Sequence, residues 1–133
     1  MKIAIRNLGF VLFFAAAVPI TGAHAADRLR AGQWEMTVDA KGKTFSHKNC
    51  TTPAEVDMMN SGDAKAIQAY ANKQLDGSGC SVKDVKISGT QVTQTTQCAG
   101  AAITSVTTYS GDSYESESSN GTKIHAKRIG ACP

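Results

Sequence analysis

The sequence has few of the residue types from which catalytic sites are built. Three histidines occur in 133 residues. His24 lies in the amino-terminal segment that we expect to be removed, so His47 and His125 are the only histidines available for a catalytic site. A hydrolase needs a nucleophile, a base and an orienting group, and neither histidine lies in a G-x-S-x-G motif or another recognisable catalytic frame. The sequence therefore predicts a protein that is not an enzyme and that carries no cofactor.

A long apolar run and a strong net charge are also missing. The apolar run from Leu8 to Ile20 is broken by Pro19 and is shorter than the roughly 18 residues of a membrane-spanning helix, so we expect no membrane anchor. Without Lys2 and Arg6, 12 basic side chains face 11 acidic ones, and the lysines are scattered. A nearly neutral chain without a basic patch is not expected to bind nucleic acid.

The chain begins with the pattern of an export signal. Lys2 and Arg6 precede the apolar run, and Ala23-His24-Ala25 has the small-x-small pattern of a cleavage site. We expect residues 1–25 to be a signal peptide and residues 26–133 to be a single domain, which is periplasmic or secreted after cleavage near Ala25. Residues 26–31 are expected to form a short polar leader to that domain.

Four cysteines lie within the expected domain, and none of them has the C-x-x-C spacing of a metal or redox site. In an oxidising compartment this predicts two disulfides. If a turn at residues 89–90 folds the flanking segments into a hairpin, Cys80 lies within one residue of Cys98, which leaves Cys50 for Cys132. The pairing of Cys50 with Cys80 and of Cys98 with Cys132 is an open alternative, because a Cys50–Cys80 bond would join the two ends of the helical segment between them.

Most of the domain has the composition of β-strands. Valine, isoleucine, threonine and tyrosine fill short runs that glycine, serine, asparagine and aspartate separate, which is typical of an antiparallel β-meander. Trp34, Met36 and Val38 alternate with polar residues and predict a first core strand. The expected strands cover residues 32–39, 44–50, 80–88, 91–98, 102–109, 114–118 and 122–129.

The apolar period changes between the second and third expected strands. Thr52 and Glu55 fit a capping box with Pro53 at the first helical position, which predicts a short helix over residues 56–59. A second helix over residues 64–75 is predicted by apolar residues that recur at intervals of three and four, namely Ala64, Ile67, Ala71 and Leu75.

Together these patterns predict an α+β domain dominated by an antiparallel meander of about seven strands, with two helices inserted after the second strand. Curling of the sheet into a half-barrel is an alternative. The later strands are rich in threonine and serine, so at most one face of the sheet is apolar. Such a sheet is expected to depend on its disulfides and its helices.

Four short motifs mark the domain from its beginning to its end. They are G-x-W-E at residues 32–35, C-T-T-P-A-E at 50–55, Y-S-G-D-S-Y at 109–114 and R-I-G-A-C at 128–132, with Cys80 and Cys98 between them. This combination resembles an uncharacterised family of small exported bacterial proteins, known as a domain of unknown function. The resemblance implies a periplasmic or secreted protein, and it implies no activity, ligand or catalytic residue.

Aromatic side chains are scarce, at 6% of the chain, and they are the candidates for lining a ligand pocket. The candidates are Trp34, Phe45, Tyr70, Tyr109 and Tyr114, and their alternative role is to complete a small core. We therefore predict a small exported binding module for a small molecule or for another envelope protein. The alternative is an envelope enzyme or a metal carrier that uses His47 or His125, with methionines as further soft ligands.

Overall fold

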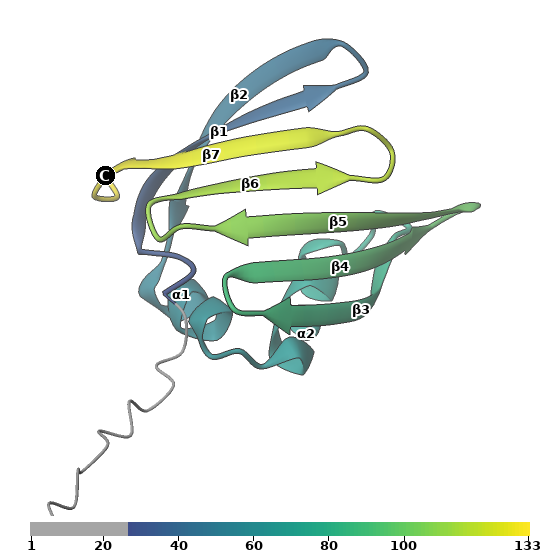
Figure 1. The fold of residues 1–133 in the computed structure, drawn as a ribbon, viewed down its shortest axis with the longest axis horizontal. Helices are drawn as coiled ribbons and strands as arrows, with labels where there is room; N and C mark the ends of the chain where they lie inside the picture. The colour runs from purple at the N-terminus through teal and green to yellow at the C-terminus, as the bar shows by residue number, and fades with distance from the viewer. Residues whose placement is uncertain (1–26) are drawn as a thin grey trace, which may run out of the picture.

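The computed structural model describes residues 27–133, and the predicted signal peptide lies outside the described residues. Seven strands and two helices follow one another along this part of the chain (Figure 1). They are β1 (Gly32–Ala40), β2 (Lys43–Thr51), α1 (Pro53–Asn60), α2 (Ala64–Gln74), β3 (Ser81–Ser88), β4 (Gln91–Cys98), β5 (Ala101–Tyr109), β6 (Ser113–Ser118) and β7 (Lys123–Gly130).

The strands form one antiparallel sheet in the order β2-β1-β7-β6-β5-β4-β3. Strands β3 to β7 follow one another as a meander, and β7 then pairs with β1, so that the β1–β2 hairpin completes the sheet. The sheet curves from β2 to β3 but does not close, which leaves these two strands as its edges (Figure 1). The predicted fold class is confirmed, including both helices after the second strand.

One face of the sheet, which we call the inner face, carries the buried side chains in two clusters. In the first cluster, Ile67 of α2 packs on Val82, Val85 and Val92 of β3 and β4. In the second, Leu29 and Trp34 pack around Ala126 of β7. Met59 and Tyr109 contact both clusters, so the two are continuous through these side chains.

Side chains at the helix ends account for where the helices begin. The Thr52 hydroxyl accepts from the Glu55 amide at 3.4 Å, and the Glu55 carboxylate accepts from the Thr52 amide at 2.7 Å, which is the predicted capping box. At the start of α2, the Asp63 carboxylate accepts from the amides of Lys65 and Ala66. Each cap satisfies amides that have no partner within the helix.

Helix α2 is tied to the edge strand β3 by polar side chains. Asn72 accepts from the Val82 amide at 2.6 Å and donates to the Val82 carbonyl at 3.2 Å. Gln68 donates to the same carbonyl at 3.0 Å. The backbone of β3 shifts its register beside Val82, so these side chains satisfy groups at an irregular point of an edge strand.

The structure forms two disulfides, Cys80–Cys98 and Cys50–Cys132, and no cysteine is free. The first joins the residue before β3 to the end of β4, two neighbouring strands. The second joins β2 to the segment after β7, and β1 lies between these two strands. The alternative pairing, in which Cys50 would bond to Cys80, is not formed.

Residues 28–31, which we call the N-terminal strap, correct the prediction of a polar leader. Arg28 is 4% exposed and Leu29 is 8% exposed. Both backbone amides donate to the side-chain oxygen of Asn60, at 2.9 and 3.1 Å. The segment is therefore part of the folded domain, because the end of α1 supplies the hydrogen bonds that water would supply to an exposed leader.

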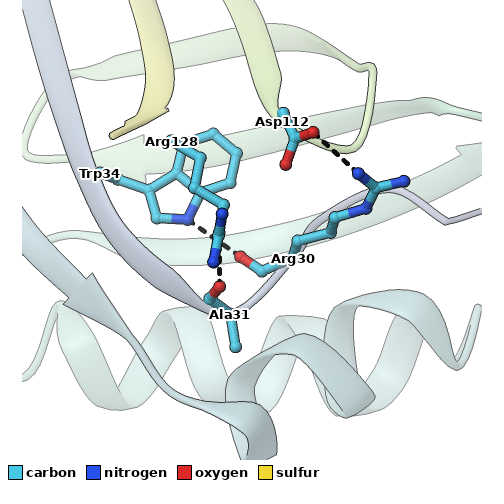
Figure 2. Close-up of polar contacts among 5 residues, drawn as sticks. All are labelled: Arg30, Ala31, Trp34, Asp112 and Arg128. Atoms are coloured by element: carbon cyan, nitrogen blue, oxygen red, sulfur yellow. Dashed lines mark hydrogen bonds and ion pairs between the residues drawn. The ribbon is translucent and has the colours of Figure 1, made fainter. Parts of the chain in front are cut away.

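The other end of the strap is held by the sheet (Figure 2). The Trp34 indole N–H donates to the Arg30 carbonyl at 3.0 Å, and the Arg128 guanidinium donates to the Ala31 carbonyl at 2.6 Å. Arg30 also forms an ion pair with Asp112 at 2.8 Å. The strap thus links β1, β7 and the turn between β5 and β6.

A close backbone approach explains the glycine at the start of β1. Gly32 has a φ of +142°, and a Cβ atom there would lie 2.3 Å from the Gly130 carbonyl oxygen on β7. A side chain is therefore excluded at this position. The glycine of the G-x-W-E motif lets the strap enter the sheet directly beside β7.

Candidate functional site

The helices leave part of the inner face uncovered, and a cleft lies between them and the sheet. It consists of two adjoining pockets of about 170 and 420 Å³. Met59, Tyr70 and Tyr109 line both pockets, so the two lie side by side, and we describe them together as one cleft. We call the smaller pocket the aromatic end and the larger one the apolar end.

Three strands of the sheet supply a row of rings to the aromatic end. The centroids of Trp34 and Tyr114 lie 5.6 Å apart, and those of Tyr114 and Tyr109 lie 5.4 Å apart, with tilted ring planes in both pairs. Tyr109 and Tyr114 are direct cross-strand neighbours. Trp34 and Tyr114 belong to β1 and β6, which flank β7, and the small side chain of Ala126 on β7 lets the two rings meet.

The two helices close the aromatic end from the other side. Glu55 of α1 and Tyr70 of α2 both line it, and the Tyr70 hydroxyl donates to the Glu55 carboxylate. This hydrogen bond is the main reason why the pKa of Glu55 lies below its usual value, and bonds from Thr52 act in the same direction. Glu55 is therefore a carboxylate at neutral pH, so this end of the cleft carries a negative charge.

The tyrosines of the sheet are neutral phenols at neutral pH. Burial raises the pKa of Tyr114 to about 12, and burial raises the pKa of Tyr109 further, although the nearby positive charge of Arg28 opposes that shift. Within residues 27–133, neither hydroxyl forms a hydrogen bond to another side chain or to the backbone. Both hydroxyls can therefore bind a polar group in the cleft.

Arg28 is buried behind the aromatic end and does not line it. Its guanidinium donates to the carbonyls of Met59 and Asn60, at 3.0 and 3.5 Å. These carbonyls lie at the carboxyl-terminal end of α1, where the helix dipole favours a positive charge. In the described part of the chain, no carboxylate forms an ion pair with Arg28.

The apolar end has an aliphatic wall and a hydroxyl-rich floor. Its wall is formed by Ile67 and Ala71 of α2, by Leu75 directly after that helix and by Val92 of β4. Its floor includes Ser105, Thr107 and Ser116. The Thr107 hydroxyl donates to the Ser116 hydroxyl at 2.9 Å. This cross-strand bond gives the Thr107 hydroxyl hydrogen a partner, which lowers the cost of placing that part of the floor against an apolar molecule.

The aromatic residues predicted from the sequence do not all reach this cleft. Trp34, Tyr70 and Tyr109 meet at the aromatic end, and Tyr114 lies with them. Phe45 does not line either pocket, because it lies on the edge strand β2 and is 55% exposed. Glu55 is a lining residue that the sequence indicated only as a helix cap.

The two histidines do not form one site. His47 pairs with Met36 and His125 pairs with Thr37, and these consecutive residues of β1 point to opposite faces of the sheet. His125 lies 3.5 Å from Glu115 on the exposed outer face. Over residues 27–133 the structure contains no group of three or more histidine, cysteine or acidic side chains that could hold a metal ion.

Neither described helix is long and apolar enough to cross a bilayer. The features above define a class of protein, a disulfide-bonded domain in which an open antiparallel sheet and two inserted helices enclose a cleft. A family model described as "Protein of unknown function (DUF3617)" matches residues 29–132, from the strap to the last cysteine, and the chain belongs to this family. Comparisons with curated proteins and with solved structures found no match.

Proposed function

We propose that this protein is a non-enzymatic binding module of the bacterial periplasm or exterior, and that its cleft binds a small molecule. The two disulfides support an oxidising compartment outside the cytoplasm. The observation that carries the proposal is the cleft itself, in which an aliphatic wall and aromatic rings lie opposite hydroxyl, amide and carboxylate side chains. A concave site that combines apolar and aromatic side chains with convergent polar groups is typical of small-molecule binding.

The polar groups of the cleft suit binding better than catalysis. Glu55 already accepts hydrogen bonds from Tyr70, from the Thr52 amide and from the Thr52 hydroxyl. A carboxylate with three donors and a lowered pKa is a weak general base, because its negative charge is already stabilised. Tyr109 and Tyr114, with raised pKa values, stay protonated and act as hydrogen-bond donors.

The binding test uses the neutral fluorescent probe N-phenylnaphthylamine, whose emission rises in an apolar environment. We expect the wild-type protein to bind it and the Ala71→Phe variant, which fills the apolar end, to lose that binding by about tenfold or more. The control is Ala69→Phe, because Ala69 lies on the exposed side of the same helix. Thr107→Phe fills the cleft from the floor instead, in case a larger side chain on α2 disturbs its packing.

The proposal fails if the wild-type protein does not bind the probe, or if Ala69→Phe and Ala71→Phe bind it equally while both remain folded by circular dichroism. Loss of binding in Ala71→Phe and in Thr107→Phe, with binding retained in Ala69→Phe, supports it.

A second candidate function, binding of another envelope protein, is favoured by the edge strand β2. Every residue from Lys43 to Cys50 is exposed. The edge of β2 that faces away from β1 pairs with no strand in the described structure. An extended segment could add to such an edge, and the lysines at 41, 43 and 48 would favour an acidic one. The alternation of the β1–β2 ladder places the Ser46 amide on the side of β2 that faces no strand. We therefore expect Ser46→Pro, which removes that amide hydrogen, to weaken binding of an acidic extended segment, and the control Ser46→Thr to leave it unchanged.

A further inference from the structure

We propose that the aromatic end of the cleft binds the ammonium group of an organic cation, and that the apolar part of the same molecule lies in the apolar end. This inference rests on the proposed function of the cleft and names the class of its ligand. Its elements are the rings of Tyr70, Tyr109 and Tyr114, the carboxylate of Glu55, and the three residues that the two neighbouring pockets share.

The first argument is the density of rings around a small volume. Three tyrosines and one tryptophan line a pocket of about 170 Å³. The face of an aromatic ring carries a partial negative charge that attracts a cation, and sites for quaternary ammonium groups combine several such rings. Neighbouring rings in the row are tilted by 36° and 47° and do not stack flat on each other.

The second argument is the charge of the helix side. Glu55 is the one residue among those lining the aromatic end that is charged at neutral pH. Arg28, the nearest buried cation, is held at the end of α1 by carbonyl oxygens and does not line the pocket. A cation in the aromatic end therefore meets an opposite charge on Glu55, whereas an anion would meet a like charge there.

The third argument is the chemical change along the cleft. The aromatic end and the apolar end meet at Met59, Tyr70 and Tyr109, which line both. Beyond them lie the aliphatic side chains of Ile67 and Leu75. A molecule with a compact cationic group at one end and an apolar chain at the other matches this order, so the structure favours an amphiphilic amine over a small inorganic cation.

The binding test compares choline with 3,3-dimethyl-1-butanol, called dimethylbutanol below, the neutral isostere in which carbon replaces the choline nitrogen. Trp34 is the only tryptophan of the chain and lies at the aromatic end, so its fluorescence reports binding there. We expect choline to bind at least about tenfold more tightly than dimethylbutanol, because only the cation interacts with the rings and with the Glu55 charge. Equal binding of the two molecules would overturn the inference.

The matched variants separate charge from shape. Glu55→Gln removes the charge but keeps the capping box, because glutamine also fits that position. We expect this variant to bind choline about threefold to tenfold more weakly and to keep its affinity for dimethylbutanol. Tyr114→Phe keeps the ring and is expected to keep choline binding, whereas Tyr114→Leu removes the ring and is expected to weaken it. Unchanged choline affinity in Glu55→Gln would contradict the inference.

Hexyltrimethylammonium tests whether the two ends bind one molecule. We expect it to bind the wild-type protein more tightly than choline, and we expect Ala71→Phe to remove this gain while leaving choline binding intact. If N-phenylnaphthylamine binds the wild-type cleft but choline shows no advantage over dimethylbutanol, the cleft is a binding site for neutral molecules, and the inference fails while the proposed function stands. If none of these probes binds, both fail.

Discussion

The two halves of the sheet are covered in different ways. Over β3 and β4, the helix α2 places Ile67 on three valines, as an amphipathic helix does in many α+β domains. Over β1 and β7, the N-terminal strap brings Leu29 to Trp34 and Ala126, and Met59 near the end of α1 packs beside them. A weakly apolar sheet can therefore be covered by a helix on one side and by a hydrogen-bonded segment on the other, with the cleft between them.

The two halves also differ in how far apart along the chain their contacts lie. In the helix-covered half, the disulfide spans 18 residues and the bonds of Asn72 to Val82 span 10. In the strap-covered half, the disulfide spans 82 residues and the bond from Arg128 to Ala31 spans 97. Because closing long loops costs more chain entropy, the strap-covered half is expected to depend more strongly on its covalent link.

The largest effect is expected from removing each disulfide by serine substitutions. In the loop-closure model, loss of Cys50–Cys132 lowers the free energy of unfolding by about 4.5 kcal/mol, and loss of Cys80–Cys98 lowers it by about 3 kcal/mol. Urea unfolding of the two double variants measures the difference. If the variant without Cys80–Cys98 were the less stable one, the contrast between the halves would not hold.

The next effect is on the buried residue at the centre of each half. Trp34 is 1% exposed and Ile67 is 3% exposed. We expect Trp34→Ala to lower the free energy of unfolding by about 3–5 kcal/mol and Ile67→Ala by about 2–5 kcal/mol. Phe45→Ala is the control and is expected to change it by less than about 0.5 kcal/mol, because Phe45 is largely exposed. Denaturant unfolding that ranks Phe45→Ala beside Trp34→Ala would contradict the assignment of the core.

A smaller contrast is expected between Asn60, which ties α1 to the N-terminal strap, and Asn72, which ties α2 to β3. The Asn60 side-chain oxygen accepts from the backbone amides of both Arg28 and Leu29, and in the described structure no second side chain accepts from these amides. Asn72 is supported by Gln68, which also donates to the Val82 carbonyl. We therefore expect Asn60→Ala to cost about 2–3 kcal/mol and Asn72→Ala about 1–2 kcal/mol.

Amide hydrogen exchange locates the effect of each asparagine. Asn60→Ala should speed exchange at Arg28 and Leu29 and leave Val82 protected, and Asn72→Ala should do the reverse. Faster exchange at both places in either variant would mean that the two halves open together.

The smallest effect is expected at the boundary between the halves, from Tyr70→Phe. Removing the hydroxyl that donates to Glu55 should raise the pKa of that carboxyl toward its usual value, which carbon-detected titration by nuclear magnetic resonance measures. The folded-state pKa lies below the unfolded one, so the bond stabilises the protein above the unfolded pKa and is lost as the pH falls through the folded pKa.

The variant should therefore lose about 1 kcal/mol or less near neutral pH, since the pair is partly exposed, and should match the wild type in acid. An unchanged pKa of Glu55 would show that the Tyr70 hydroxyl does not donate to it in solution.

The sequence contained enough information to predict individual strands and helices in both halves. The alternation of Trp34, Met36 and Val38 predicted β1, and the capping box at Thr52 predicted α1, because both patterns depend on residues that are close in the chain. The strap could not be predicted in the same way. Arg28 is polar and near the end of the domain, and its burial depends on Asn60, which is 32 residues away.

The candidate site was predictable only in part, for a similar reason. Trp34 and Phe45 both alternate with polar neighbours, yet Trp34 lies in a strand with partners on both sides and Phe45 lies on an edge. The sequence alone does not predict that β1 pairs with β7, which places β7 between β1 and β6. That order places Ala126 between Trp34 and Tyr114 and creates the row of rings.

The most direct test of the cleft is a set of nuclear Overhauser contacts between the wild-type protein and bound hexyltrimethylammonium. We predict contacts from the ammonium methyls to the rings of Tyr70, Tyr109 and Tyr114, and from the end of the hexyl chain to Ile67 and Leu75. Contacts to the outer face instead, around Val106 and Thr108, would contradict the account, because they would place the ligand on the side of the sheet opposite the cleft.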